Sequence, residues 1–295
     1  RWMFAIPIIS VLFIPALVKN LPDEHAKGAQ IDGWGFTLIG AFAGAVTMFF
    51  TDMNLLWSVA SIVTLVAFIV YINKAKDPFI TPAFFKNPAF VATMVVIFVG
   101  YFFSYTLNAG VNAIGLDVFG LDSAQVSNLL VWSILLAAVL GFVCGPVVKK
   151  IGRSAAIIMA LLTMGLGLIA VAFAIPHGSI AALAVAPCLY YYGTSFFYSP
   201  IVDTATLTVT PEESGRVLGA NDLIQAITGS VGVAIFGQMM SAGVMSGGSI
   251  AGTEAGAAST YANVFLIGGV IVLSALVIFI LTKKMIYSRS RKDGE

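Results

Sequence analysis

The feature that most constrains this chain is a series of long apolar runs, each about as long as an α-helix needs to be to cross a bilayer, roughly 17–25 residues. Hydrophobic residues make up 59% of the chain and charged residues only 10%, a balance that the surface of a soluble domain would not tolerate. The expected fold class is all-α transmembrane. Nine spans are predicted: Trp2–Val18, Gly33–Thr51, Leu55–Ile72, Ala89–Ala113, Val126–Val148, Ala155–Ile175, Ile180–Val202, Val217–Gly243 and Val264–Thr282.

The basic residues gather on one side of the membrane when these spans are threaded back and forth. Of the fifteen Lys and Arg residues, all but Arg1 fall on that side. Cytoplasmic loops carry such an excess, so we expect a multi-pass protein of a bacterial-type plasma membrane with a cytoplasmic C-terminus. The odd number of spans places Arg1 outside, and the chain opens without an initiator Met or a signal peptide. We therefore expect it to start partway through a larger protein.

The spacing of the runs suggests three regions. Residues 1–32 hold one span and a hydrophilic loop, residues 33–88 two spans and a loop, and residues 89–295 six spans and a basic tail. Only Asp52, Met53 and Asn54 separate the two spans of the middle region, which predicts an antiparallel hairpin. The last six spans suggest two inverted triplets, an arrangement typical of secondary transporters.

A polar stripe follows the fourth predicted span. Its members are spaced to share one face of a continuous α-helix: Tyr101, Ser104, Tyr105, Asn108 and Asn112. Polar side chains within a spanning helix line a cavity or bond to a neighbouring helix. We predict that they line a substrate cavity, with interhelical hydrogen bonding as the alternative.

Aromatic and hydroxyl side chains cluster in the seventh predicted span, in the segment YYYGTSFFYSP. Tyr191, Ser195 and Tyr198 share a face and are further cavity candidates. Aromatic ring faces attract organic cations, so the expected substrate is a small cationic or amphiphilic organic molecule. Packing or an interfacial aromatic belt is the alternative explanation.

The eighth predicted span follows a helix start signal. Thr210 is the expected N-cap, Pro211 occupies the first helical position, and Glu212 and Arg216 are spaced to pair on the first turn. Farther along, Asn221, Gln225 and Thr228 share one face inside the apolar run, and Asn221 and Gln225 are cavity candidates.

Two aspartates are candidates for proton coupling. Asp222 lies inside the eighth predicted span and Asp203 ends the seventh. Acidic groups in a bilayer usually face protein or water, because exposure to lipid is costly. Either could bind and release a proton if burial raises its pKa. The alternative explanation for each is a salt bridge with Arg216 or a helix cap.

Several classes of function find no support in the residues. His25 and His177 are the only histidines and both lie in predicted loops, so we expect neither an enzyme nor a metal site. No phosphate-binding loop of an ATP-driven pump and no charged rings of a channel are present. Cys144 and Cys188 fit buried apolar positions. We expect a monomer without cofactor or nucleic-acid partner.

A basic segment between the fifth and sixth spans carries a recognisable motif. The sequence GFVCGPVVKKIGRS predicts a tight loop, and its motif residues are Gly145, Lys149, Lys150, Gly152 and Arg153. This pattern resembles the second copy of the cytoplasmic gating-loop motif of the major facilitator superfamily, G-x-x-x-D-[RK]-x-G-R. Lys149 occupies the position of the family's Asp, so a charge clamp that depends on that Asp is not expected in this half.

Two further stretches resemble the fourteen-span drug/proton antiporter branch of that superfamily. They are RWMFAIP at the start and SPIVDTATLTVTPEESGRVLGANDLIQAITGSVGVAIFG. The resemblance implies that the nine spans are spans six to fourteen: the last helix of the N-terminal bundle, a central two-helix insert, and the C-terminal bundle. It also implies alternating access, with inward proton flow driving drugs or antibiotics such as tetracycline out of the cytoplasm. The alternative is a secondary transporter of an endogenous metabolite or lipid-like compound.

Glycines recur at positions where spans would need to approach closely. The pairs predicted to do so are Gly215 and Gly219, Gly229 and Gly232, Gly165 and Gly167, and Gly141 and Gly145. We predict that they serve helix packing.

Overall fold

The computed structural model describes residues 11, 14–20, 32–254 and 256–290. The chain divides into two compact units, Arg1–Asp32 and Gly33–Glu295. In the first unit the structure describes helix α1, Ile14–Asn20, which carries Lys19 in its last turn. Most of the expected span Trp2–Val18 lies outside the described residues.

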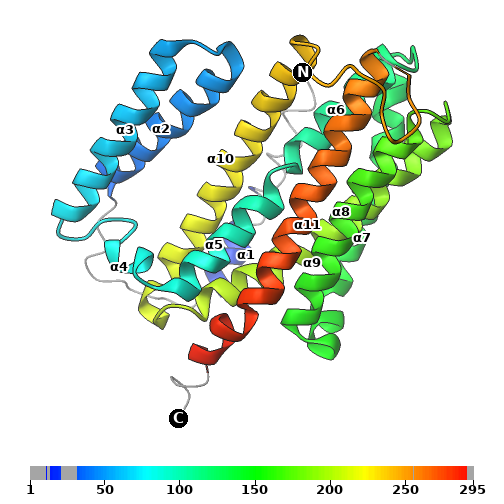
Figure 1. The fold of residues 1–295 in the computed structure, drawn as a ribbon. Coiled ribbons are helices and arrows are strands. Elements are labelled where there is room, and N and C mark those ends of the chain that lie inside the picture. Colours follow the sequence, from blue (N-terminus) through cyan, green and yellow to red (C-terminus); the bar gives the residue numbers. More distant parts are fainter. Residues whose placement is uncertain (1–10, 12–13, 21–31, 255, 291–295) are drawn as a thin grey trace. The chain divides into compact units, whose positions relative to one another are not determined.

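The described part of the second unit is built of helices (Figure 1). Eight helical stretches in it are long and apolar enough to cross a membrane, with α5 and α6 counted together, which confirms the all-α transmembrane fold class. The helices are α2 Gly33–Asp52, α3 Leu55–Lys74, α4 Pro82–Phe85, α5 Pro88–Tyr101, α6 Ser104–Asp117, α7 Ser123–Ile151, α8 Arg153–Ala174, α9 Ile180–Thr206, α10 Ser214–Ser241 and α11 Ala257–Ser290.

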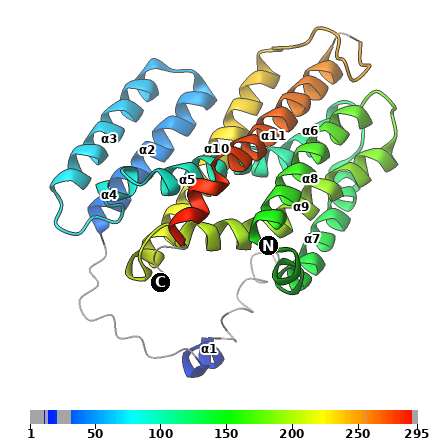
Figure 2. The same ribbon diagram turned by 60° about the horizontal axis from the view of Figure 1, so that its bottom comes forward.

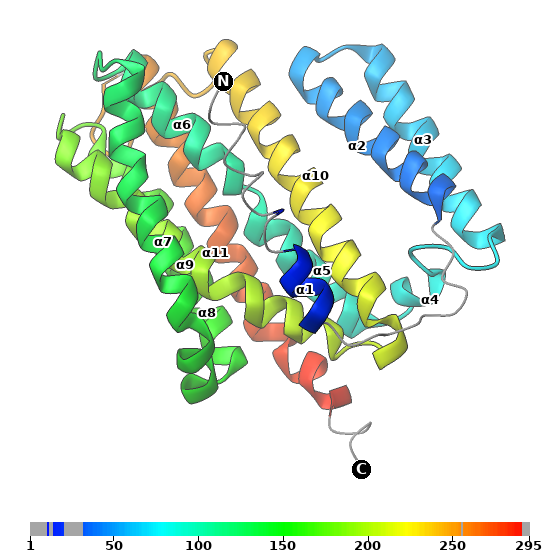
Figure 3. The same ribbon diagram turned by 180° about the vertical axis from the view of Figure 1, so that it is seen from behind.

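Helices α2 and α3 form the predicted hairpin and lie beside α10, as the views from the front and from behind both show (Figures 1 and 3). The hairpin turns at Met53, which adopts a φ of +50°. Asn54 then caps α3, because its side chain accepts a hydrogen bond of 2.9 Å from the backbone N–H of Leu56. On the α10 side, the Phe36 and Phe79 rings stack with centroids 4.4 Å apart.

The fourth predicted span is broken in the middle, so the prediction of one continuous helix is wrong. Helix α5 ends at Tyr101 and α6 begins at Ser104, with Phe102 and Phe103 between them. The break lies where glycines of two other helices approach closely. A Cβ on Gly268 of α11 would lie 2.5 Å from the Phe103 ring, and one on Gly232 of α10 would collide with the Phe102 carbonyl oxygen.

The tightly packed interior of the unit lies around α8, which contacts both α9 and α11 (Figure 2). Close approach again depends on glycine, because a Cβ on Gly167 would lie 2.5 Å from the backbone nitrogen of Tyr190. The packing role is thus confirmed for Gly165 and Gly167 and for Gly229 and Gly232. It is wrong for Gly141, Gly145 and Gly215, where a Cβ would meet nothing within 4 Å. At Gly219 the close neighbour is the Phe79 ring, 2.8 Å from the Cβ position.

Two predicted helix boundaries differ from the structure. Residues Pro211–Glu213 form a single 3₁₀ turn, Thr210 makes no side-chain cap hydrogen bond, and α10 begins only at Ser214. Arg216 forms an ion pair with Asp77, in the segment between α3 and α4; the Glu212 side chain lies outside the described residues. The tight loop predicted at Gly145 is also wrong, because α7 continues through the motif to Ile151.

Candidate functional site

Asp222 lies within the membrane-spanning part of α10, about 12 Å along the helix from its start at Ser214. Two side chains donate hydrogen bonds to the same carboxylate oxygen, Oδ1: the Tyr198 hydroxyl of α9 at 3.1 Å and the Asn221 amide at 2.9 Å. The described residues supply no donor to the other oxygen, Oδ2. The carboxylate is therefore held in place through one of its two oxygens.

A second polar contact joins the predicted cavity residues of α6 and α9. The Tyr191 hydroxyl donates to Asn108 Oδ1 at 2.7 Å, and the Asn112 amide donates to the Asn108 backbone oxygen at 2.9 Å. All three side chains are partly buried. The structure therefore brings together residues that lie more than 80 positions apart in the sequence, and it confirms the interhelical hydrogen bonding that was the alternative for the polar stripe. Cavity lining by these residues stays a prediction.

The other predicted cavity residues are distributed differently. Tyr101 is only 3% exposed and packs on the Phe197 ring, with centroids 5.2 Å apart. The Ser195 hydroxyl donates to the Ala137 carbonyl of α7 at 3.0 Å. Tyr105 is half exposed, with its ring over Gly229, and Gln225 is half-buried. Ser104 donates to the Tyr101 carbonyl at 2.7 Å, beside the helix break.

Several buried polar atoms near this region have no hydrogen-bond partner among the described residues. They are the hydroxyls of Tyr101, Thr106, Tyr190 and Thr228 and the Oδ1 atom of Asn221. Buried polar groups are normally paired, and an unpaired one costs free energy. Tyr190 was not among the site residues predicted from the sequence, because a tyrosine in an apolar run gives no indication of whether its hydroxyl will find a partner.

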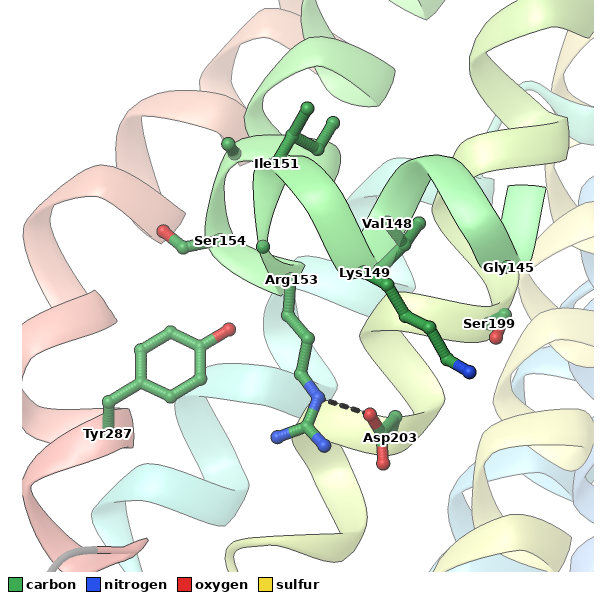
Figure 4. A pocket seen from close by; sticks show the side chains of 11 residues that line it. Gly145, Val148, Lys149, Ile151, Arg153, Ser154, Ser199, Asp203 and Tyr287 are labelled. Carbon is green, nitrogen blue, oxygen red and sulfur yellow. Dashed lines mark ion pairs between the residues drawn. The ribbon is translucent and has the colours of Figure 1, made fainter. Parts of the chain in front are cut away.

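Arg153 of the basic motif meets Asp203 at the end of the bundle where α7 joins α8, which we call the basic end. The Arg153 guanidinium forms an ion pair with Asp203 through Nε (Figure 4). The predicted alternative, a salt bridge between Asp203 and Arg216, is therefore wrong, since Arg216 pairs with Asp77. Beside this pair the Tyr287 hydroxyl of α11 lies 3.0 Å from the Thr204 hydroxyl, a contact that no sequence motif predicted.

Gly152 forms the whole junction between α7 and α8, with φ +83° and ψ 154°. Non-glycine residues avoid this conformation at a cost of about 1–3 kcal/mol. We expect G152A to lower the maximal transport rate severalfold and to change the half-saturating substrate concentration less than twofold. The reason is that the strain falls on the junction between α7 and α8 and not on the predicted substrate-cavity residues. Transport kinetics of the purified, reconstituted protein measure both quantities.

G141A is the matched control for G152A, because Gly141 has ordinary helical backbone in the same helix and open space around its Cβ position. It should transport as the unchanged protein does. A loss of substrate affinity at an unchanged maximal rate in G152A would contradict a gating role for this junction.

The opposite end of the bundle holds a further polar contact that the sequence did not predict. The Tyr261 hydroxyl of α11 donates to Asp117 Oδ2 at 2.5 Å, at the last residue of α6.

Of the two cysteines, Cys144 is buried and the Cys188 sulfur lies 3.2 Å from the Ser133 hydroxyl. Within the described ranges no group of three His, Cys, Asp or Glu side chains is placed to hold a metal ion.

Comparison with known proteins agrees with this architecture. Residues 2–233 match the family model described as Major Facilitator Superfamily. The chain is also 20% identical over 260 residues to the "Multidrug transporter protein MdtP" of Bacillus subtilis (strain 168), an alignment that covers 82% of this chain and 47% of the relative. It thus spans about half the length of the curated relative that it matches.

The family match, the membrane-spanning helices and the resemblance of the basic motif to the gating loop all point to one family of small-molecule transporters. This chain belongs to the Major Facilitator Superfamily.

Proposed function

We propose that this chain forms the C-terminal part of a proton-coupled antiporter that exports drugs or antibiotics by alternating access. The observation that carries the proposal is the carboxylate of Asp222, which lies inside a spanning helix and has two donors on Oδ1. A coupling site must gain and lose a proton in each cycle. A carboxylate with one oxygen held and the other free can do so without losing its position.

The surroundings of α10 suit a substrate that is part apolar and part polar. An apolar cavity of about 280 Å³ lies between α5 and α10, with Phe90, Met94 and Phe98 on one wall and Ile224 on the other. Tyr191, Asn108 and Asn112 supply uncharged polar groups between α6 and α9. Aromatic rings and amides together favour amphiphilic organic cations, which ring faces attract. No cofactor is needed, since the proton gradient supplies the driving force.

Efflux measurements test this function directly. Cells that express the complete reading frame are loaded with a fluorescent cationic dye or with tetracycline, and efflux is followed with and without a protonophore. We expect efflux that stops when the proton gradient is collapsed. Efflux that continues after the collapse would exclude proton coupling. No efflux of either compound, from protein shown to be folded in the membrane, would favour a transporter of an endogenous metabolite or lipid-like compound.

A further inference from the structure

A cavity of about 690 Å³ opens at the basic end, between the ends of four helices. Its polar lining comes from Lys149 of α7, Arg153 and Ser154 of α8, Ser199 and Asp203 of α9, and Tyr287 of α11, all shown in Figure 4. The cavity is large enough for a small molecule or a headgroup, since ligand pockets usually measure about 300–1,000 Å³. It is separate from the polar cluster around Asp222.

The charges that line this cavity do not balance. Lys149 and Arg153 are cationic, whereas Asp203 is the only acidic side chain in the lining. The ion pair with Asp203 uses the Nε atom of Arg153, and no described ion pair engages its two terminal nitrogens or the Lys149 ammonium. One positive charge is left over, and the arginine retains donors for a second acceptor.

The start of α8 adds further donors to the same cavity. Gly152 precedes the helix and has no side chain to cap it, so the first-turn N–H groups of Arg153, Ser154 and Ala155 lack a side-chain acceptor. These residues line the cavity, and the positive end of the helix dipole lies there. The Ser154 and Ser199 hydroxyls add two donors that can rotate toward an acceptor.

We propose that this cavity binds a phosphate group. Guanidinium, ammonium and backbone N–H donors reach the cavity from two helices and from the junction between them, an arrangement that suits a tetrahedral anion better than a flat carboxylate. The phosphate belongs to a lipid headgroup or is free inorganic phosphate. Val148 and Ile151 continue the lining onto α7, whose outer surface is apolar, with Phe142 87% exposed, so acyl chains have a surface to follow.

Native mass spectrometry of the detergent-purified, full-length protein tests this site. The probes are phosphatidylglycerol, diacylglycerol with the same acyl chains but no phosphate, and inorganic phosphate. K149Q removes a cation that lines the cavity, and K150Q removes its neighbour, which does not line it. We expect K149Q to weaken phosphatidylglycerol binding about fivefold, the effect of one basic residue near an anionic headgroup. K150Q should change it less than twofold.

S154E keeps the test decisive even if K149Q folds poorly. A glutamate in the first turn of α8 favours the helix dipole, so the variant should remain folded, yet its charge repels phosphate. We expect it to lose phosphatidylglycerol binding more than tenfold, with unchanged elution on size exclusion. Competition by millimolar inorganic phosphate would identify free phosphate as the occupant, and its absence would identify the lipid. Equal losses in K149Q and K150Q, or equal binding of diacylglycerol, would overturn the proposal.

Discussion

D222N is expected to lower proton-driven substrate transport by on the order of a hundredfold, near the low end of what a proton-transferring side chain contributes to a rate. Asparagine has nearly the same shape as aspartate, and its carbonyl oxygen can still accept from Tyr198 and Asn221. The fold should therefore persist, while the ability to bind and release a proton is lost. Transport driven by an imposed pH gradient, in vesicles that contain the full-length protein, measures the effect.

Two controls make the D222N result specific. Exchange of labelled for unlabelled substrate needs no net proton movement and should continue in D222N. D117N makes the same chemical change in an exposed aspartate at the end of α6, where an amide oxygen can still accept from Tyr261. It should keep proton-driven transport. If D222N transported normally across the whole pH range, Asp222 would have only a structural role.

G232A is expected to destabilise the protein by about 1–3 kcal/mol, the usual cost of adding atoms to a well-packed site. A Cβ at this position of α10 would collide with the backbone oxygen of Phe102, and it would lie 3.2 Å from the Thr106 hydroxyl oxygen. A backbone atom cannot move aside as a flexible side chain can, so the helix break itself must shift. Thermal unfolding of the purified protein should show a midpoint lower by on the order of 5 °C.

G237A, five residues later on the same helix, is the matched control. Nothing lies within 4 Å of the Cβ position at Gly237, so the substitution adds no clash. It should leave the midpoint unchanged or raise it slightly, because alanine favours a helix over glycine by about 0.5–1 kcal/mol. Equal midpoints for G232A and the unchanged protein would mean that α10 and the α5–α6 break are not in rigid contact.

The break between α5 and α6 could not be predicted from the local sequence. Its polar stripe predicts one helix face, and neither Phe102 nor Phe103 is a residue that ends helices. The chain breaks there nevertheless, where Gly232 and Gly268 of two distant helices allow close approach. Tyr101 consequently packs in the core, whereas Tyr105, only four residues later, is half exposed. Residue spacing on a straight helix predicts that Tyr101 and Tyr105 share one face, and so it does not predict this difference in exposure.

The sequence by itself determined the features that depend on one segment at a time. Hydropathy and length sufficed to predict a transmembrane helical protein, the α2–α3 hairpin and an acidic residue inside α10. Only the tertiary structure decided which polar groups meet: Tyr198 with Asp222, Tyr191 with Asn108, and Arg153 with Asp203. The hydropathy of a helix depends only on its own residues. The partner of a side chain depends instead on how each helix is rotated and packed against the others. Contacts between residues far apart in the sequence set that rotation.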